Sequence, residues 1–241
     1  MCEQFVARAT EPFRIDELWP FTEQLERYGI AAFGWGAAWL AIDGEIHSHR
    51  DVRAFRDDPE REAIGRRETT SLLVHLRRPS RLSTIGLADT QPFDDPKGRY
   101  ALSHNGDFEH HAERRAGYRD QGRIQGRADT EVGARWLEDA WSGDSSAPGL
   151  LESLHDTFGG LANLAVLSQS GEVWHYAGNR DNPVFTFQLG GIAIASTALY
   201  SLDRSLFRFV APDATERRLV PLRTTASLAA PGLAEAVVTS R

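Results

Sequence analysis

Several residue types are scarce in this chain of 241 residues. It has one cysteine, Cys2, and one lysine, Lys97, so its 27 basic residues are almost all arginine. A single cysteine excludes an intramolecular disulfide and any zinc site built from several thiolates. No apolar run approaches the roughly 18 residues of a membrane span, and the first residues lack the basic and then apolar pattern of a signal peptide. We therefore expect a soluble, cytoplasmic protein with no membrane partner.

Positive charge is also in deficit. The chain has 34 acidic residues, a formal net charge of -7 and a sequence pI near 5.6. Proteins that bind nucleic acid neutralise its phosphates with lysine and arginine, so we expect no nucleic-acid partner. The 41% of hydrophobic residues supports an ordinary buried core, and the length fits one large domain or two small ones.

The single cysteine stands directly after Met1. Removal of the initiator methionine, which is usual before a small side chain, would leave a thiol and an α-amino group on one residue. An α-amine has a pKa of about 7.7–8.0 and can act as the general base for that thiol. The sequence here reads Cys2-Glu3-Gln4-Phe5, with no apolar core to indicate a structural role. Cys2 is therefore a candidate nucleophile, and the alternative is a cysteine present by chance.

Short apolar runs separated by turn signals predict mostly β structure. Strands are expected at 31–42, 45–47, 71–76, 98–103, 161–167, 172–176, 184–189 and 192–195, with hairpin turns at Asp43-Gly44 and Gly190-Gly191. Apolar residues at helical spacing predict helices at 16–28, 129–141 and 149–158. The polar stretch 50–69 is expected as an exposed loop or a solvated helix. Many antiparallel strands with few helices predict an α+β sandwich whose helices cover the outer faces of sheets.

Three polar clusters stand at predicted strand ends or at a helix start. They are His75-Leu76-Arg77-Arg78-Pro79-Ser80, Ser103-His104-Asn105-Gly106-Asp107 and Gly126-Arg127-Ala128-Asp129-Thr130-Glu131. The side-chain amide of Asn105 and the backbone N–H of Gly106 can supply two donors to an oxyanion. The Arg77 guanidinium can clamp a carboxylate, and the Asp129 carboxylate can hold an ammonium. Together they would recognise the head group of an α-amino acid.

Each of these residues also has a structural interpretation. Asp129 precedes a helical pattern and could be its N-cap. Asn105-Gly106 is a common turn dipeptide, and Arg77 could form a surface ion pair. Five histidines suggest a metal, namely His47, His49, His104, His110 and His111. However, His110 and His111 are adjacent and point apart, and no acidic ligand stands at zincin spacing, so no metal is expected.

In combination, the motifs resemble the class II glutamine amidotransferase domain of the N-terminal nucleophile hydrolase superfamily. The chain is most similar to stand-alone members, which include the γ-glutamyl hydrolase of ergothioneine biosynthesis. That family opens with a processed Met-Cys and continues with His/Thr-x-Arg-x-x-Thr, His-Asn-Gly and Gly-x-x-Asp-Ser/Thr-Glu. This chain has Met1-Cys2, Arg77 with Ser80 in the threonine place, His104-Asn105-Gly106 and Asp129-Thr130-Glu131, over residues 1 to about 200.

The resemblance implies a fold and a set of roles. The fold would be a single domain over residues 1–241, a four-layer αββα sandwich of two antiparallel sheets covered by helices. Cys2 would attack a γ-carbonyl to form a γ-glutamyl thioester, and Asn105 with the Gly106 N–H would form the oxyanion hole. Arg77, helped by Ser80, would bind the substrate α-carboxylate, and Asp129 the α-ammonium. The implied activity is hydrolysis of glutamine or a γ-glutamyl compound without a cofactor, releasing ammonia or an amine.

Two positions depart from the family pattern. Where the family commonly has Asn-x-His-Pro, this chain reads Asp89-Thr90-Gln91-Pro92-Phe93, and Arg78 replaces an aromatic or small residue. The 41 residues after position 200 are too few for an appended synthase domain. Either a separate synthase subunit receives the ammonia, or the protein is a simple hydrolase. The alternative function is a non-catalytic γ-glutamyl-binding or regulatory subunit of an amidotransferase complex.

Overall fold

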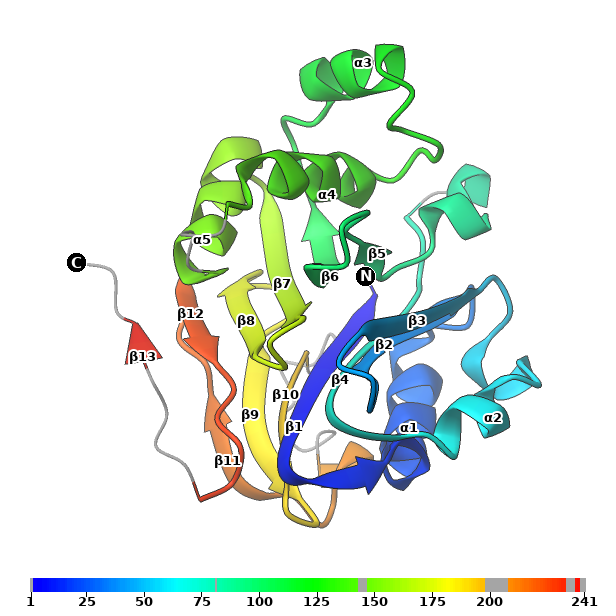
Figure 1. The fold of residues 1–241 in the computed structure, drawn as a ribbon, viewed down its shortest axis with the longest axis vertical. Coiled ribbons are helices and arrows are strands. Elements are labelled where there is room, and N and C mark those ends of the chain that lie inside the picture. Colours follow the sequence, from blue (N-terminus) through cyan, green and yellow to red (C-terminus); the bar gives the residue numbers. More distant parts are fainter. Residues whose placement is uncertain (1, 81, 143–146, 198–207, 233–236, 239–241) are drawn as a thin grey trace.

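Two β-sheets form the middle of the molecule, and helices flank them (Figure 1). The structure is a computed structural model that describes residues 2–80, 82–142, 147–197, 208–232 and 237–238. The larger sheet has seven strands in the order β11-β9-β10-β1-β4-β2-β3, and the smaller has six in the order β13-β12-β8-β7-β6-β5. Every registered strand pair is antiparallel.

The strands of the larger sheet are β1 (Glu3–Arg14), β2 (Trp35–Leu40), β3 (Ile46–Asp51), β4 (Glu68–Leu76), β9 (Val184–Leu189), β10 (Ile192–Thr197) and β11 (Thr215–Leu219). Those of the smaller sheet are β5 (Phe93–Asp94), β6 (Tyr100–Asp107), β7 (Leu161–Ser168), β8 (Val173–Gly178), β12 (Thr224–Ser227) and β13 (Val237–Val238). The α-helices are α1 (Trp19–Gly29), α2 (Arg61–Gly65), α3 (Ala112–Asp120), α4 (Asp129–Ala140) and α5 (Ala147–Phe158). Short 3-10 turns are η1 (Ile15–Leu18), η2 (Phe55–Asp57), η3 (Leu82–Thr84) and η4 (Leu87–Asp89).

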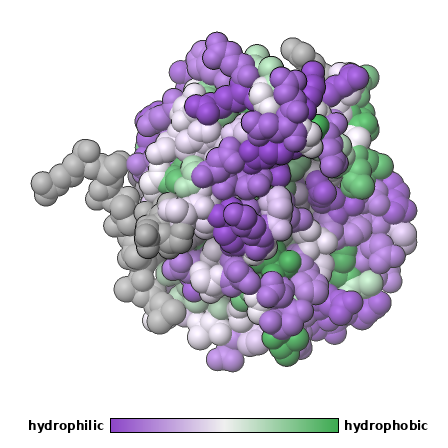
Figure 2. Space-filling view, turned by 45° about the horizontal axis from the view of Figure 1, so that its top comes forward, coloured by the Kyte–Doolittle hydropathy of each residue, from purple (hydrophilic) through white to green (hydrophobic). Residues whose placement is uncertain are grey.

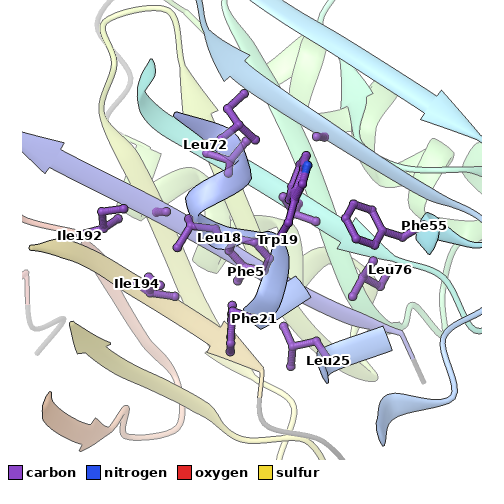
Figure 3. Close-up of a cluster of buried hydrophobic side chains, with 14 of the residues drawn as sticks. Phe5, Leu18, Trp19, Phe21, Leu25, Phe55, Leu72, Leu76, Ile192 and Ile194 are labelled. Carbon is purple, nitrogen blue, oxygen red and sulfur yellow. The ribbon is translucent and has the colours of Figure 1, made fainter. Parts of the chain in front are cut away.

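Three apolar clusters separate four layers. Successive side chains of a strand face opposite sides of its sheet, so β1 sends Phe5 outward and Val6 inward. Phe5 packs with Trp19 and other side chains of η1 and α1 on the outer face of the larger sheet (Figure 3). A second cluster packs α4 and α5 against the outer face of the smaller sheet, and Val6 belongs to a third cluster between the sheets. The predicted αββα sandwich is thereby confirmed.

Most predicted strands are present. Those expected at 71–76, 161–167, 184–189 and 192–195 correspond to β4, β7, β9 and β10, and the hairpin turns at Asp43-Gly44 and Gly190-Gly191 join β2 to β3 and β9 to β10. The prediction for 98–103 is wrong at its end, because β6 continues to Asp107. The second polar cluster therefore lies within a strand.

Sequence patterning does not predict β1 or α3. The first residues of β1, Glu3 and Gln4, are polar yet buried, which hides the alternation that signals a strand. In α3 the one buried side chain is Tyr118, and the helix projects from the body of the molecule (Figure 1). The stretch 50–69 is neither one loop nor one helix, since it holds the end of β3, η2, α2 and the start of β4.

One face of the molecule is seen in the space-filling view of Figure 2. On the face shown in Figure 2, hydrophilic side chains predominate and hydrophobic ones form small separate groups. Among the described residues, no helix is long and apolar enough to span a membrane.

Candidate active site

Cys2 lies immediately before β1, the strand between β10 and β4 in the larger sheet. The half-buried thiol accepts a hydrogen bond from the backbone N–H of Arg78 (3.3 Å) and lies 3.6 Å from the Arg78 carbonyl oxygen. Burial raises the pKa of the Cys2 thiol, while the Arg78 N–H and the charge of Arg77 act in the opposite direction. The thiol is therefore protonated at neutral pH and needs a base to become a nucleophile.

Asn105 comes from β6 and reaches Cys2 across the gap between the sheets. Its Nδ2 donates a hydrogen bond to the carbonyl oxygen of Cys2. Its Oδ1 accepts from Nδ2 of Asn179 (3.3 Å) and of Asn182 (3.5 Å). Asn163 in turn donates to the backbone oxygen of Asn182 (2.6 Å). Because these amides occupy the Asn105 oxygen, its NH2 group faces Cys2.

Gly106 follows Asn105 in β6 and pairs with Ala162 of β7. A Cβ atom at position 106 would lie 1.7 Å from the carbonyl oxygen of Leu161, so only glycine fits there. The interpretation of Asn105-Gly106 as a turn is wrong, because both residues belong to a paired strand.

Arg77 follows the last residue of β4 and is only 4% exposed. Its Nη2 donates to the carbonyl oxygen of Thr84 (2.5 Å), and its Nη1 is buried without a hydrogen-bond partner. Burial lowers the pKa of Arg77, and the nearby Cys2 and Asp89 counteract that shift. Among the described residues no carboxylate forms an ion pair with Arg77. A buried guanidinium without a carboxylate has the chemistry to accept an anion, and the interpretation of Arg77 as a surface ion-pair residue is wrong.

Ser80, expected to assist Arg77, is exposed at the surface. The acceptor next to the guanidinium comes instead from Thr84, in the segment after Ser80. A role for Ser80 in substrate binding therefore stays a prediction.

Asp129 is the first residue of α4, and Ala128 occupies the N-cap position. Its Oδ2 accepts the backbone N–H of Phe108 (2.7 Å) and lies 3.8 Å from Nδ1 of His104. The interpretation of Asp129 as the N-cap is wrong. The start of α4 is capped from a distance, because Oδ1 of Asp89 accepts the N–H groups of Arg127 (2.5 Å) and Ala128 (2.7 Å).

Gln91 aligns the strand that carries Asn105. Its Nε2 donates to the carbonyl oxygen of His104 (3.0 Å), and its Oε1 accepts the His104 N–H (2.6 Å). Nε2 also lies 3.3 Å from Oγ1 of Thr130 in α4. The sequence marks Gln91 as a departure from the family pattern, and the structure shows that this side chain joins β6 to α4.

His49, Asp51 and Asp58 each place one potential ligand atom within 4.8 Å of the others. These carboxylates already have partners. Arg53 pairs with Asp51 (2.6 Å) and Asp58 (3.2 Å), and the Trp35 indole N–H donates to Asp58 (3.0 Å). A guanidinium within the group opposes a metal cation, so we interpret the cluster as structural.

Comparisons with known proteins show the fold. No protein-family profile and no curated protein matches this sequence. Glutamine phosphoribosylpyrophosphate amidotransferase from B. subtilis, in a complex with ADP and GMP, is similar over 98% of this chain and 49% of its own, with a TM-score of 0.74 and 18% identity. A glutamine aminotransferase class-II domain protein from Silicibacter pomeroyi is similar over 98% of this chain and 100% of its own, with a TM-score of 0.59 and 16% identity.

A third structure, described as the allosteric regulatory enzyme of purine biosynthesis, is similar over 94% of this chain and 46% of its own, with a TM-score of 0.68 and 18% identity. The chain thus spans about half the length of the amidotransferase and of the allosteric regulatory enzyme, and the full length of the class-II domain protein. Its fold is that of a class II glutamine amidotransferase domain.

Proposed function

We propose that this chain is a cysteine-dependent amidohydrolase that acts on glutamine or another γ-glutamyl compound. The arrangement around Cys2 is the main support. The side-chain amide of Asn105 donates to the backbone of Cys2, and the backbone N–H of Arg78 donates to the thiol. The residue before Arg78 is the buried Arg77, whose Nη1 has no hydrogen-bond partner. The fold likeness to two proteins described as acting on glutamine supports the same function.

The reaction begins at Cys2 once Met1, which lies outside the described residues, has been removed. The α-amine takes the thiol proton, and the sulfur attacks the γ-carbonyl carbon of the substrate. The carbon–nitrogen bond then breaks, the α-ammonium gives its proton to the departing nitrogen, and ammonia or an amine leaves. Water, deprotonated by the same amine, then attacks the thioester; the carbon–sulfur bond breaks, the α-ammonium returns the proton to the Cys2 sulfur, and glutamate leaves. The raised pKa of the thiol makes this internal base necessary.

The oxyanion of each tetrahedral intermediate needs donors beside Cys2. Asn105 Nδ2 supplies one donor, and the backbone N–H of Gly106 is the second in this proposal. A donor of this kind typically contributes about 2.7–4 kcal/mol to the stabilisation of the transition state. Asn179 and Asn182, which donate to the side-chain oxygen of Asn105, keep the amide oriented before the substrate binds.

The head group of the substrate is bound by opposite charges. The unpartnered donor of Arg77 takes the α-carboxylate, with Ser80 assisting, and Asp129 takes the α-ammonium. Both residues are fixed by their surroundings, Arg77 through Thr84 and Asp129 through Phe108. A substrate lacking either charged group should bind weakly, because the buried charge left behind would have no partner.

Intact-protein mass spectrometry with a diazoketone analogue of glutamine tests the proposal. We expect loss of Met1 and one adduct on Cys2, blocked by excess glutamine. Cys2→Ala should lose both the adduct and glutamate release while keeping the melting temperature, because the hydrogen bonds of the thiol among the described residues are to backbone atoms of Arg78.

Glutamate release by Cys2→Ala would overturn the proposal. Calorimetry separates it from the alternative function: a trimmed chain that binds glutamine tightly but releases no glutamate is a γ-glutamyl-binding or regulatory subunit. Glutamate release that rises on adding a co-purifying protein would identify a separate synthase subunit as the acceptor of ammonia.

A further inference from the structure

A second pocket lies where the edges of the two sheets meet. Strands β3 and β5 are the edge strands on this side, and Ser48 of β3 donates a hydrogen bond to Asp94 of β5 (2.6 Å). The pocket has a volume of about 380 Å³ and is lined by β3, η4, β5, the segment after α3, and α4. Cys2, Arg77, Asn105 and Asp129 do not line it.

Three arginines line this pocket, and two of them keep unused donors. Arg123 is neutralised by Asp139 (2.7 Å) and Glu138 (3.2 Å). Arg50 donates through Nη1 to the carbonyl oxygen of Thr90 (3.1 Å) and has no carboxylate partner among the described residues. Its guanidinium lies 5.9 Å from the centre of the Phe93 ring, which helps to fix its position.

Arg135, from α4, pairs with Glu138 through Nη1 (2.8 Å). Its Nε is buried without a hydrogen-bond partner. A buried guanidinium nitrogen without an acceptor is costly unless a ligand or water supplies one. Arg135, which lines this pocket, therefore keeps one guanidinium donor that no described group accepts.

The two carboxylates in the lining are already engaged. Glu131 accepts the backbone N–H groups of Gln125 and Gly126 with its two oxygens, both at 2.8 Å. Asp94 accepts the hydroxyl of Ser48. Neither forms an ion pair with Arg50 or Arg135 within 4.0 Å among the described residues. Arg50 and Arg135 thus form no ion pair with either of the lining carboxylates, although burial raises the pKa of Asp94 and the charges of both arginines lower it.

We propose that this pocket binds the phosphate group of a small phosphorylated metabolite. A guanidinium offers paired donors whose geometry matches phosphate oxygens, and two guanidiniums from different elements suit a dianionic group. The remaining lining residues are Leu87, Ala88, Phe93 and Gln125, and the three apolar ones can pack against the organic part of the ligand.

The pocket shares its wall with the candidate active site. Leu87 and Ala88 directly precede Asp89, whose carboxylate holds the start of α4, and α4 begins with Asp129. A bound ligand would contact both the capping segment and the capped helix. If it changes glutamine affinity, glutamine must change the affinity of the ligand by the same factor.

Calorimetric titration of the full chain with phenyl phosphate at fixed ionic strength tests the proposal. We expect saturable binding at one site, and at least about tenfold weaker binding in both Arg50→Gln and Arg135→Gln, because each removes charge-assisted hydrogen bonds. Arg66→Gln is the matched control, since Arg66 is exposed and does not line the pocket. Arg50→Lys, which keeps the charge and loses the paired donors, should bind with intermediate affinity.

Absence of saturable binding, or equal affinity in Arg50→Gln and Arg66→Gln, would overturn the proposal. Equal affinity for sulfate and phenyl phosphate would show an ion site without a role for the apolar wall, and would overturn the assigned ligand class. Should Arg135→Gln unfold through loss of its pair with Glu138, Arg50→Gln remains decisive. Binding requires no turnover, so this result is independent of whether the chain hydrolyses glutamine.

Discussion

The Asn105 side chain is fixed on both its polar atoms, the oxygen by Asn179 and Asn182 and the nitrogen by the carbonyl of Cys2. Such an arrangement is pre-organised, because the donor does not have to rotate as charge develops on the substrate. In the proposed reaction the substrate oxygen takes the place next to this donor.

Asn105→Ala should lower kcat by about 10²–10³ with a small change in KM, because the lost hydrogen bond acts on the transition state. Steady-state release of glutamate measures both constants. Asn105→Asp is the matched variant, since it keeps the size and the acceptor and removes the donor. Near-normal kcat in the alanine variant would exclude Asn105 from the oxyanion hole.

At this scale the sequence predicts residues that carry recognisable chemistry and misses those that support them. Asn179 and Asn182 lie 74 and 77 positions from Asn105, in a segment whose composition indicates only a turn. Asp89 shows the same limit, because its partners Arg127 and Ala128 lie 38 and 39 positions away. A contact over such separations depends on the register of the sheets, and no local pattern encodes it.

Helix α4 depends on the segment before β5. Asp89 accepts the N–H of the N-cap residue Ala128 and that of Arg127 just before it, where the N-cap residue itself supplies no side-chain hydrogen bond. Its carboxylate is also well placed to interact with the positive end of the helix dipole. The cap therefore ties the segment after Arg77 to the helix that begins with Asp129.

Asp89→Ala should lower the free energy of unfolding by about 1–2 kcal/mol, as for other lost helix caps. It should also raise KM for glutamine more than it lowers kcat, because Asp129 loses its fixed position. Urea denaturation and steady-state kinetics measure the two effects. Asp89→Asn keeps one acceptor oxygen, so its free energy of unfolding and its KM for glutamine should both be close to those of the wild type. A change in stability with unaltered KM would limit Asp89 to a structural role.

Apolar runs around a glycine turn predict β9 and β10, and helical spacing predicts α4, which places Val132 and Leu137 on its buried face. No apolar pattern predicts β1, because its first buried positions carry the polar residues Glu3 and Gln4. The predicted end of β6 is too early for the same reason, since His104 and Asn105 are buried polar residues within the strand.

Buried histidines make the stability of the whole molecule depend on pH. His75 and His175 are at most 4% exposed. Burial lowers the pKa of His75 to about 3 and that of His175 to about 4, and it also lowers the pKa of His104. Below pH 6.5 the unfolded chain binds protons at these residues and the folded chain does not, so folding becomes less favourable.

The free energy of unfolding should therefore fall as pH drops from about 6.5 toward 4, by about 1.4 kcal/mol per pH unit for each such histidine. His175→Gln removes one titrating group, so the free energy of unfolding should fall less steeply with decreasing pH, by about 1.4 kcal/mol per pH unit. His47→Gln, at an exposed histidine, is the control. Urea denaturation between pH 4.5 and 8 provides the measurement. Identical slopes in His175→Gln and wild type would contradict the assignment.

Cys2 lies directly beside the larger sheet, because the next residue, Glu3, already pairs with Leu76 of β4. For protein production this fixes where an affinity tag belongs. A peptide fused ahead of Cys2 would have to leave the fold past Arg78 and Asn105, in the space that the proposed reaction requires for its substrate. Activity measured on such a fusion would describe an obstructed protein, and a cleavable tag would serve only if cutting leaves Cys2 as the first residue.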